Sequence, residues 1–130
     1  DLDESALLAP GLHALSNATI DVPWPKSRRL MAAVEQSLGL PREAMLEALL
    51  AALSDHGRPP DDALPDTGVG LPRERMLAPV FIAGDGYGTR MSTVILVDRD
   101  GRVDFVERDA TPGASAPLQI ATHFQLDPVA

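Results

Sequence analysis

The sequence predicts an α+β fold in which two helices come before a group of antiparallel strands. Apolar residues recur at helical spacing within residues 25–38 and again within residues 41–55. A short apolar run, a tight-turn sequence and an alternating run then follow within residues 93–108, which is typical of a β-hairpin. Helices and strands that are grouped in this way favour an α+β layout.

The first helix is predicted over Pro25–Leu38. Proline suits the first turn of a helix, because the N–H that it lacks would have no partner there. Leu30 and Val34 carry an apolar stripe towards Leu38, and Gly39 ends the pattern.

The second helix is predicted over Pro41–Asp55, where a proline again opens the helix and Gly57 ends it. Its apolar face consists of Met45, Leu46, Leu49, Leu50 and Leu53. Because both apolar stripes need a surface to cover, we expect the two helices to share one layer against the sheet.

The hairpin is predicted from three consecutive segments. Val94–Val97 is apolar and rich in β-branched residues, which indicates a strand that is buried on both faces. Asp98–Gly101 matches a type I turn, and we expect Gly101 to have a positive φ. Arg102–Arg108 is then the return strand, paired with Thr93–Asp98.

The remaining segments give weaker patterns. Short strands are predicted at residues 11–15 and 79–83, and a final strand at residues 119–126. Residues 58–70 and 110–117 are rich in turn-forming residues and predict loops, and residues 72–77 predict one helical turn. We find no internal boundary, so residues 1–130 are expected to form a single domain.

The composition limits the function. A net charge of -8 disfavours a general nucleic-acid binder and docking on anionic membranes. The chain has no cysteine and therefore has no disulfide, thiol nucleophile or cysteine metal site of its own. No apolar run approaches the roughly 20 residues of a membrane span. No signal peptide is visible, and we expect a cytoplasmic protein.

Four stretches in a fixed order carry a family resemblance. They are Leu-Ser-Asn-Ala-Thr at 15–19, Pro-Trp-Pro-Lys at 23–26, Leu-Pro-Asp-Thr-Gly-Val-Gly at 64–70, and the hairpin segment at 86–108. On these motifs, residues 11–108 resemble the NRDE proteins, the family named for Transport and Golgi organization 2. The family's amino-terminal Cys and its Asn-Arg-Asp-Glu signature are absent, and Met91 stands where the family usually has Ser or Cys. The chain therefore resembles the carboxy-terminal half of an NRDE domain.

The resemblance implies a particular architecture. It is the αββα sandwich of the amino-terminal-nucleophile hydrolases, in which two antiparallel sheets stack between helices on the outer faces. The resemblance also implies that the family's first strands are missing from this chain. We therefore expect an unpaired sheet edge, with the missing amino-terminal segment or a companion chain as the partner.

Asn17 is the first candidate site residue, and two interpretations of it are open. From its local sequence it is a turn or capping residue. Its segment is also similar to the Leu-Thr-Asn-Ser segment of bile-salt hydrolases and penicillin V acylases, in which that Asn helps to form the oxyanion hole. The resemblance implies that the side-chain amide of Asn17 stabilises a developing oxyanion.

Arg90 and Ser92 are the other candidate catalytic residues, at the entrance to the apolar strand. The structural interpretation is a solvated Arg beside a Ser that caps the turn. The functional interpretation is a guanidinium that binds a carboxylate or phosphate, or that lowers the pKa of a nucleophile. We expect Asn17 and Arg90 to converge on one concave region, with Ser92 nearby.

The histidines do not predict a metal site. His13, His56 and His123 are far apart in the sequence and lack metal-binding spacing, so we expect neither a metal nor another cofactor. His56 lies near a predicted helix end, where it complements the helix dipole.

Two main classes of function are open. The first is a cysteine-dependent amide hydrolase whose nucleophile lies outside this chain and uses its own free amine as base. The second is a non-catalytic protein with a small-molecule ligand, for which the resemblance implies haem handling, lipid handling or Golgi organisation. A purely structural half-domain is the third alternative, and fold alone does not choose among them.

Overall fold

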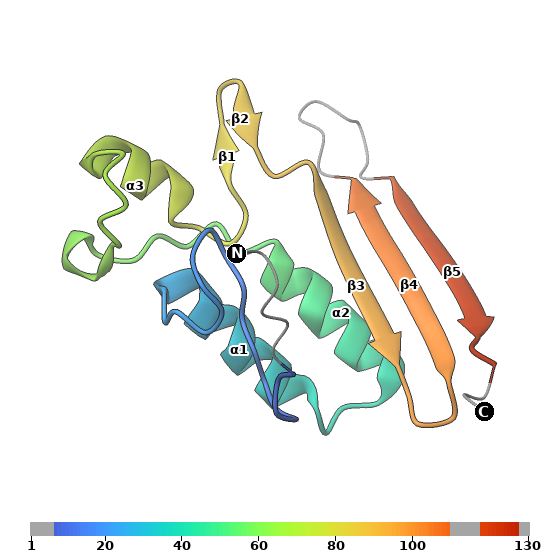
Figure 1. Ribbon diagram of the computed structural model, residues 1–130. Coiled ribbons are helices and arrows are strands. Elements are labelled where there is room, and N and C mark those ends of the chain that lie inside the picture. The colour runs from blue at the N-terminus through green and yellow to red at the C-terminus, as the bar shows by residue number, and fades with distance from the viewer. Residues whose placement is uncertain (1–6, 110–117, 128–130) are drawn as a thin grey trace, which may run out of the picture.

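The computed structural model describes residues 7–109 and 118–127 (Figure 1). Its elements are α1 (Pro25–Ser37), α2 (Arg42–Leu53), the 3-10 helix η1 (Asp61–Ala63), α3 (Leu71–Leu77), β1 (Ala83–Gly84), β2 (Tyr87–Gly88), β3 (Met91–Val97), β4 (Arg102–Asp109) and β5 (Gln119–Gln125). Helices therefore precede antiparallel strands, and the predicted α+β class is confirmed. The loop predicted at residues 110–117 lies outside the described residues.

The main sheet has three antiparallel strands in the order β3-β4-β5. The predicted hairpin is confirmed, with Val94 opposite Val106 and Ile95 opposite Phe105. Gly101 has a φ of 81°, as expected for the turn. The turn is held by Asp98, whose Oδ1 accepts hydrogen bonds from the backbone N–H groups of Asp100 and Arg102 at 3.0 and 2.9 Å. The predicted last strand is confirmed as β5, which pairs with β4.

The core lies between α2 and one face of this sheet. Leu50 on α2 packs with Val94 on β3 and Val106 on β4, and all three side chains are buried. Leu46, Leu49, Leu53 and Leu96 surround this cluster. The two helices pack against each other, but α2 makes the main contact with the sheet, while α1 lies on the far side of α2 (Figure 1).

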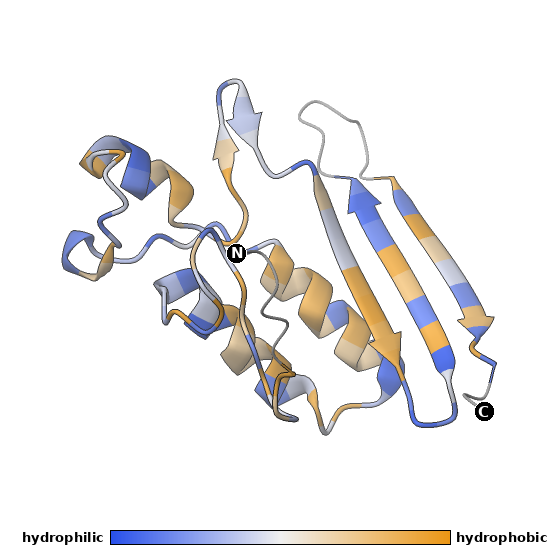
Figure 2. Ribbon diagram, in the orientation of Figure 1, coloured by the Kyte–Doolittle hydropathy of each residue, from blue (hydrophilic) through white to orange (hydrophobic). Residues whose placement is uncertain are grey.

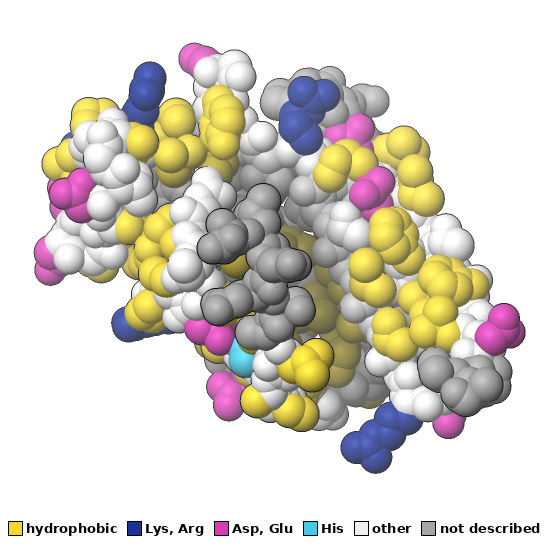
Figure 3. Space-filling model, in the orientation of Figure 1, with side chains coloured by type: hydrophobic (Ala, Val, Ile, Leu, Met, Phe, Trp, Pro, Cys, Tyr) yellow, Lys and Arg dark blue, Asp and Glu magenta, His cyan; other side chains and the backbone are white. Residues whose placement is uncertain are grey.

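The other face of the sheet is apolar and exposed. Side chains alternate between the two faces of a strand, so Ile95 and Val97 point away from α2, and each is 57% exposed. We call this surface the outer face; its exposed apolar residues are Met91, Ile95, Val97, Ile120 and Phe124. The expectation that Val94–Val97 is buried on both faces is therefore wrong for the described residues, because only α2 covers the sheet. Figure 2 shows the apolar character of β3, and Figure 3 shows apolar side chains gathered over this region.

Two short strands were predicted incorrectly. Residues 11–15 have no strand partner among the described residues, and the side chain of Asp21 holds this segment in an irregular loop instead. Of residues 79–83, only Ala83 lies in a strand, where it pairs with Gly88 in the small β1–β2 hairpin. The backbone before it makes other bonds, such as Phe81 N–H to Asp55 O at 2.9 Å. The helical turn predicted at residues 72–77 is confirmed as α3.

Candidate functional site

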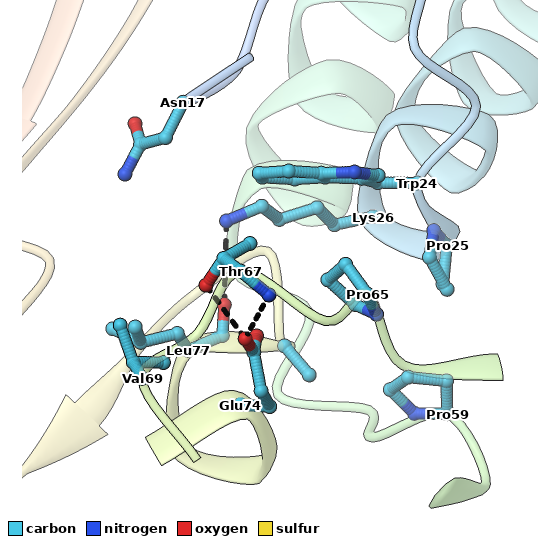
Figure 4. Close-up of a pocket in the computed structure, with 11 residues that line it drawn as sticks. Asn17, Trp24, Pro25, Lys26, Pro59, Pro65, Thr67, Val69, Glu74 and Leu77 are labelled. Atoms are coloured by element: carbon cyan, nitrogen blue, oxygen red, sulfur yellow. Dashed lines mark hydrogen bonds between the residues drawn. The ribbon is translucent and has the colours of Figure 1, made fainter. Parts of the chain in front are cut away.

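A small cavity lies where α1, α3 and the loops beside them meet (Figure 4). We call it the Trp24 cavity. Its volume is about 140 Å³, and its lining residues are Asn17, Trp24, Pro25, Lys26, Pro59, Pro65, Thr67, Val69, Glu74, Leu77 and Ala78. Three of the four motif segments recognised in the sequence, at 15–19, 23–26 and 64–70, contribute to this lining. Segments that are distant in the sequence therefore form one site.

Asn17 reaches the cavity from an irregular loop that Asp21 stabilises. The Asp21 backbone N–H donates to Ala14 O at 2.7 Å, and its Oδ1 accepts from the Ala14 N–H at 2.8 Å. Its Oδ2 lies 2.7 Å from His13 Nδ1. Asp21 has a φ of 61°, a conformation that Asp tolerates better than most residues. These bonds close the loop that presents Asn17, which is itself exposed.

Lys26 and Trp24 form one wall of the cavity. Pro25 begins α1 and places the two side chains next to each other, with Lys26 Nζ 5.5 Å from the centre of the Trp24 ring. Lys26 Nζ also donates to Leu77 O at the end of α3, at 3.3 Å. Burial lowers the pKa of the Lys26 ammonium, and the charge of Glu74 partly opposes this effect. The cation thus lies in a partly desolvated, largely apolar environment.

Glu74 forms the opposite wall and is only 5% exposed. Its Oε1 accepts from the Thr67 backbone N–H at 2.7 Å and from Thr67 Oγ1 at 2.6 Å. Gly70 precedes α3 with a φ of 84°, a conformation that favours glycine. The bonds to Glu74 fix the motif loop onto α3 and give the loop a defined position at the cavity.

The structure places Arg90 elsewhere. Arg90 is exposed between β2 and β3, and it lines a second depression formed by residues 81–89 of the small hairpin. Ser92 is buried in β3, on the face that α2 covers. Of the three candidate residues, Asn17 lines the Trp24 cavity, whereas Arg90 and Ser92 do not belong to its lining. Their catalytic roles stay predictions.

The histidines have structural partners within the described part of the chain. His13 bonds to Asp21, and His123 Nδ1 lies 2.5 Å from Asp104 Oδ1. His56 packs edge-to-face on Phe81, with ring centres 4.6 Å apart. No group of three or more His, Cys, Asp or Glu residues suited to a metal ion occurs among residues 7–109 and 118–127. In the same residues, no helix is both long and apolar enough for a membrane crossing.

Two important residues of the cavity, Lys26 and Glu74, were not predicted as site residues from the sequence. Lys26 belongs to the Pro-Trp-Pro-Lys motif, but the motif alone does not reveal that the Lys26 side chain is half-buried. Glu74 lies in a polar stretch and looks like a surface residue until its bonds to Thr67 are known. Each residue has one indication in the sequence: Lys26 lies within a motif, and Glu74 follows the 64–70 segment by one helical turn.

The fold and the site define an α+β protein in which helices pack on one face of an antiparallel sheet and motif segments enclose a cavity. Residues 2–112 match the family model described as Transport and Golgi organisation 2. The chain therefore belongs to the Transport and Golgi organisation 2 family.

Three curated relatives agree with this assignment. The bovine Transport and Golgi organization protein 2 homolog is 40% identical over 127 residues, which cover 92% of this chain and 46% of the relative. The human protein of the same name is 40% identical over 110 residues, covering 78% of this chain and 40% of the relative. The mouse Transport and Golgi organization 2 homolog is 39% identical over 112 residues, covering 81% of this chain and 41% of the relative. The chain thus spans less than half the length of these relatives.

Proposed function

We propose that the Trp24 cavity binds a small organic molecule, and that this binding is the contribution of this chain to the function of its family. The convergence of three family motifs on one cavity is the observation that carries the proposal. The lining is mainly apolar, with Asn17, Lys26, Thr67 and Glu74 as its polar members. A few polar groups in an apolar concavity are the usual composition of a ligand site.

The size of the cavity favours a compact group. A cavity of about 150 Å³ in another protein holds one benzene molecule, and the Trp24 cavity has a similar volume of about 140 Å³. A ring or a short branched chain fits this space. A larger ligand, such as a haem or a long-chain lipid, would place only one part of itself in the cavity and the rest on the surrounding surface.

Amide hydrolysis is the second candidate function, and the position of Asn17 favours it. A carboxamide at the edge of a cavity is suited to donate a hydrogen bond to an oxyanion. This chain has no cysteine, so the nucleophile would come from the part of the family domain that lies outside it. Non-catalytic handling of a ligand, in transport or in Golgi organization as the names of the relatives suggest, uses the same cavity without that nucleophile.

The outer face supports an αββα architecture for the complete domain. It carries Ile95, Val97 and Phe124, although a free sheet face would normally be polar. The relatives have more than half of their length outside the matched region, which is enough chain for a second sheet. In this proposal, residues 1–130 form about half of an NRDE domain, and the other half covers the outer face. If the outer face is normally covered, the isolated chain should self-associate through it, and Ile95→Thr should reduce this self-association. Self-association that is unaffected by Ile95→Thr would count against the proposed αββα architecture.

Ligand binding can be tested with intrinsic fluorescence, because Trp24 is the single tryptophan of the chain. Small ring compounds and branched aliphatic compounds, both neutral and charged, are titrated while the Trp24 emission is recorded. Ala78→Leu fills the cavity and should abolish the response, whereas Ala44→Leu on exposed helix surface should leave it intact. If no compound changes the emission of the folded chain, the proposed function is wrong.

The hydrolase alternative needs a different experiment. The full-length family polypeptide that carries this segment is assayed with small acyl amides, and Asn17 is replaced by Ala. Loss of a donor used in the transition state lowers kcat with little change in KM. An equal kcat in the variant and the wild type would exclude an oxyanion role for Asn17.

A further inference from the structure

We infer that Lys26 is the ligand-binding residue of the Trp24 cavity, and that it binds the carboxylate of a small organic acid whose apolar body occupies the cavity. The inference rests on the proposed function and adds the class of the ligand. It depends on the position of one ammonium group, on the groups around it and on the shape of the apolar wall.

Two features make this position unfavourable for a cation, and the contacts of Lys26 with Leu77 O and the Trp24 ring offset only part of their cost. Lys26 is the second residue of α1, and a positive charge at a helix N-terminus opposes the helix dipole. The side chain is half-buried, so its charge also loses part of its hydration. Within residues 7–109 and 118–127 no carboxylate forms an ion pair with Lys26, in contrast to several arginines of the same chain, and the charge of Glu74 only partly offsets the effect of burial. A charged group that lines a cavity in a partly desolvated position is a candidate functional residue.

The Lys26 ammonium has donors left for a ligand. An ammonium carries three N–H groups, and the described contacts of Lys26 Nζ use one of them, for Leu77 O. The stem of Lys26 lies along the Trp24 ring, which fixes the direction of the amine (Figure 4). The remaining donors are thus held at the cavity instead of moving freely in solvent.

The groups around the Lys26 ammonium restrict where an anion can bind. Glu74 lies on one side of the ammonium, and its Oε1 already accepts from Thr67. Its negative charge repels an anion on that side. Asn17 lies apart from the ammonium, on the side away from Glu74, and also lines the cavity (Figure 4). A carboxylate between Lys26 and Asn17 would therefore meet an ammonium and a carboxamide and would keep away from Glu74.

The other walls of the cavity suit an apolar ligand body. Trp24, Pro25, Pro65, Val69 and Leu77 provide rigid or apolar surface around the cavity. A volume of about 140 Å³ admits a six-membered ring. One ammonium beside an apolar cavity favours small acids with one compact apolar body. Phosphates and sugars are disfavoured because they have no apolar body to fill the cavity.

The experiment compares two ligands of the same shape. Cyclohexanecarboxylate and cyclohexanecarboxamide are titrated into the wild-type chain, with Trp24 fluorescence and calorimetry as readouts. We expect the carboxylate to bind about tenfold or more tightly than the amide, as for the gain of one charge-assisted hydrogen bond. Lys26→Gln should remove this preference, and Lys26→Arg should retain most of it. Arg28→Gln, which removes an exposed cation from the same helix, should change neither affinity.

The outcomes separate this inference from the proposed function. If the amide binds as tightly as the acid, the carboxylate assignment is wrong while the cavity stays a ligand site. If neither compound nor any other small ligand binds, both proposals fall. A loss of folding in Lys26→Gln, detected by circular dichroism, would not rescue the inference, because the comparison of the two ligands in the wild type needs no variant.

Discussion

Glu74 Oε1 accepts two hydrogen bonds from Thr67, one from the backbone N–H at 2.7 Å and one from Oγ1 at 2.6 Å. The two residues are seven positions apart, and a positive-φ glycine, Gly70, lies between them. This pair joins a family motif to α3 and gives the Trp24 cavity one of its walls.

Thr67→Val should lower the free energy of unfolding by about 1–2 kcal/mol, because the buried Glu74 carboxylate loses one of its donors. Chemical denaturation measures the change. Thr93→Val is the matched control, since Thr93 Oγ1 also bonds to a glutamate, Glu107, but on exposed strand surface. Equal effects of the two substitutions would show that burial of Glu74 gives the Thr67 bond no special weight.

The His13–Asp21 pair should give the loop that carries Asn17 a defined pH window. The hydrogen bond to Asp21 raises the pKa of His13 above 6.5, and the same bond lowers the pKa of Asp21 below 3.8. The contribution of the His13 charge to the stability of the loop is complete below pH 6.5 and is lost as the pH rises through the raised pKa of His13. The Asp21 contribution is present above 3.8 and is lost as the pH falls through the lowered pKa. Both are present together between these two values.

Asp21→Asn tests this window, because Asn tolerates the positive φ but cannot carry the charge. In an NMR titration, the pKa of His13 should fall towards 6.5 in the variant. Asp66→Asn alters another turn aspartate, whose Oδ1 accepts from Gly68 N–H, and should leave His13 unchanged. A His13 titration that is the same in Asp21→Asn and wild type would contradict the pairing.

Gly101→Val should destabilise the hairpin by about 1 kcal/mol or more, because β-branched residues avoid a positive φ. A Cβ at this position would also lie 3.0 Å from Gln125 Nε2 and 3.2 Å from Leu126 O. Gly39→Val is the control, since no atom lies within 4 Å of a Cβ there. Thermal denaturation of the two variants gives the comparison, and equal melting temperatures would be inconsistent with a special role for Gly101.

Arg42→Met should weaken the attachment of α2 to the hairpin. The Arg42 guanidinium bonds to the buried carboxylate of Asp104 and donates to Leu96 O at 3.0 Å. Its loss leaves a buried acceptor with fewer partners, which costs about 1–3 kcal/mol. The hydrogen bond from Arg42 is also the main reason why the pKa of Asp104 is lowered.

The Arg42 variant should therefore lose less stability than the wild type when the pH falls, since less of the Asp104 contribution is left to lose. The Asp104 contribution is lost as the pH falls below 3.8 and through the lowered pKa, so denaturation curves at pH 7 and at a pH well below 3.8 measure the difference. Arg28→Met removes an exposed arginine from α1 and should have little effect at either pH. Identical acid sensitivity of Arg42→Met and wild type would exclude Arg42 as the residue that controls the Asp104 pKa.

The parts of the fold that were predicted correctly depend on local sequence. The Asp98–Gly101 turn has its own hydrogen bonds and needs little from the rest of the chain, so its sequence is a reliable signal. The periodic apolar residues of α1 and α2 are equally local. Residues 11–15 were predicted incorrectly because the side chain of Asp21 decides their conformation. Asp21 is eight positions away from its partner His13, so no local pattern reveals the contact.

The candidate site was harder to predict for the same reason. Asn17 was recognised because its motif is similar to that of known enzymes, and the structure places it at the Trp24 cavity. The cavity itself joins residues as distant as Asn17 and Ala78, and no periodic pattern connects them. Arg90 and Asn17 both belong to family motifs, yet Arg90 lines a different depression. Membership in a motif does not fix the position of a residue in space.

The central claim, that the Trp24 cavity is a ligand site, is tested most directly by the Trp24 indole N–H signal in a ¹H–¹⁵N NMR spectrum. The chain has one tryptophan and hence one such signal. Our account predicts that cyclohexanecarboxylate shifts this signal in a saturable manner in the wild type, and that Ala78→Leu abolishes the shift. If the acid binds but perturbs only signals outside the cavity, with the indole signal unmoved, the account is contradicted.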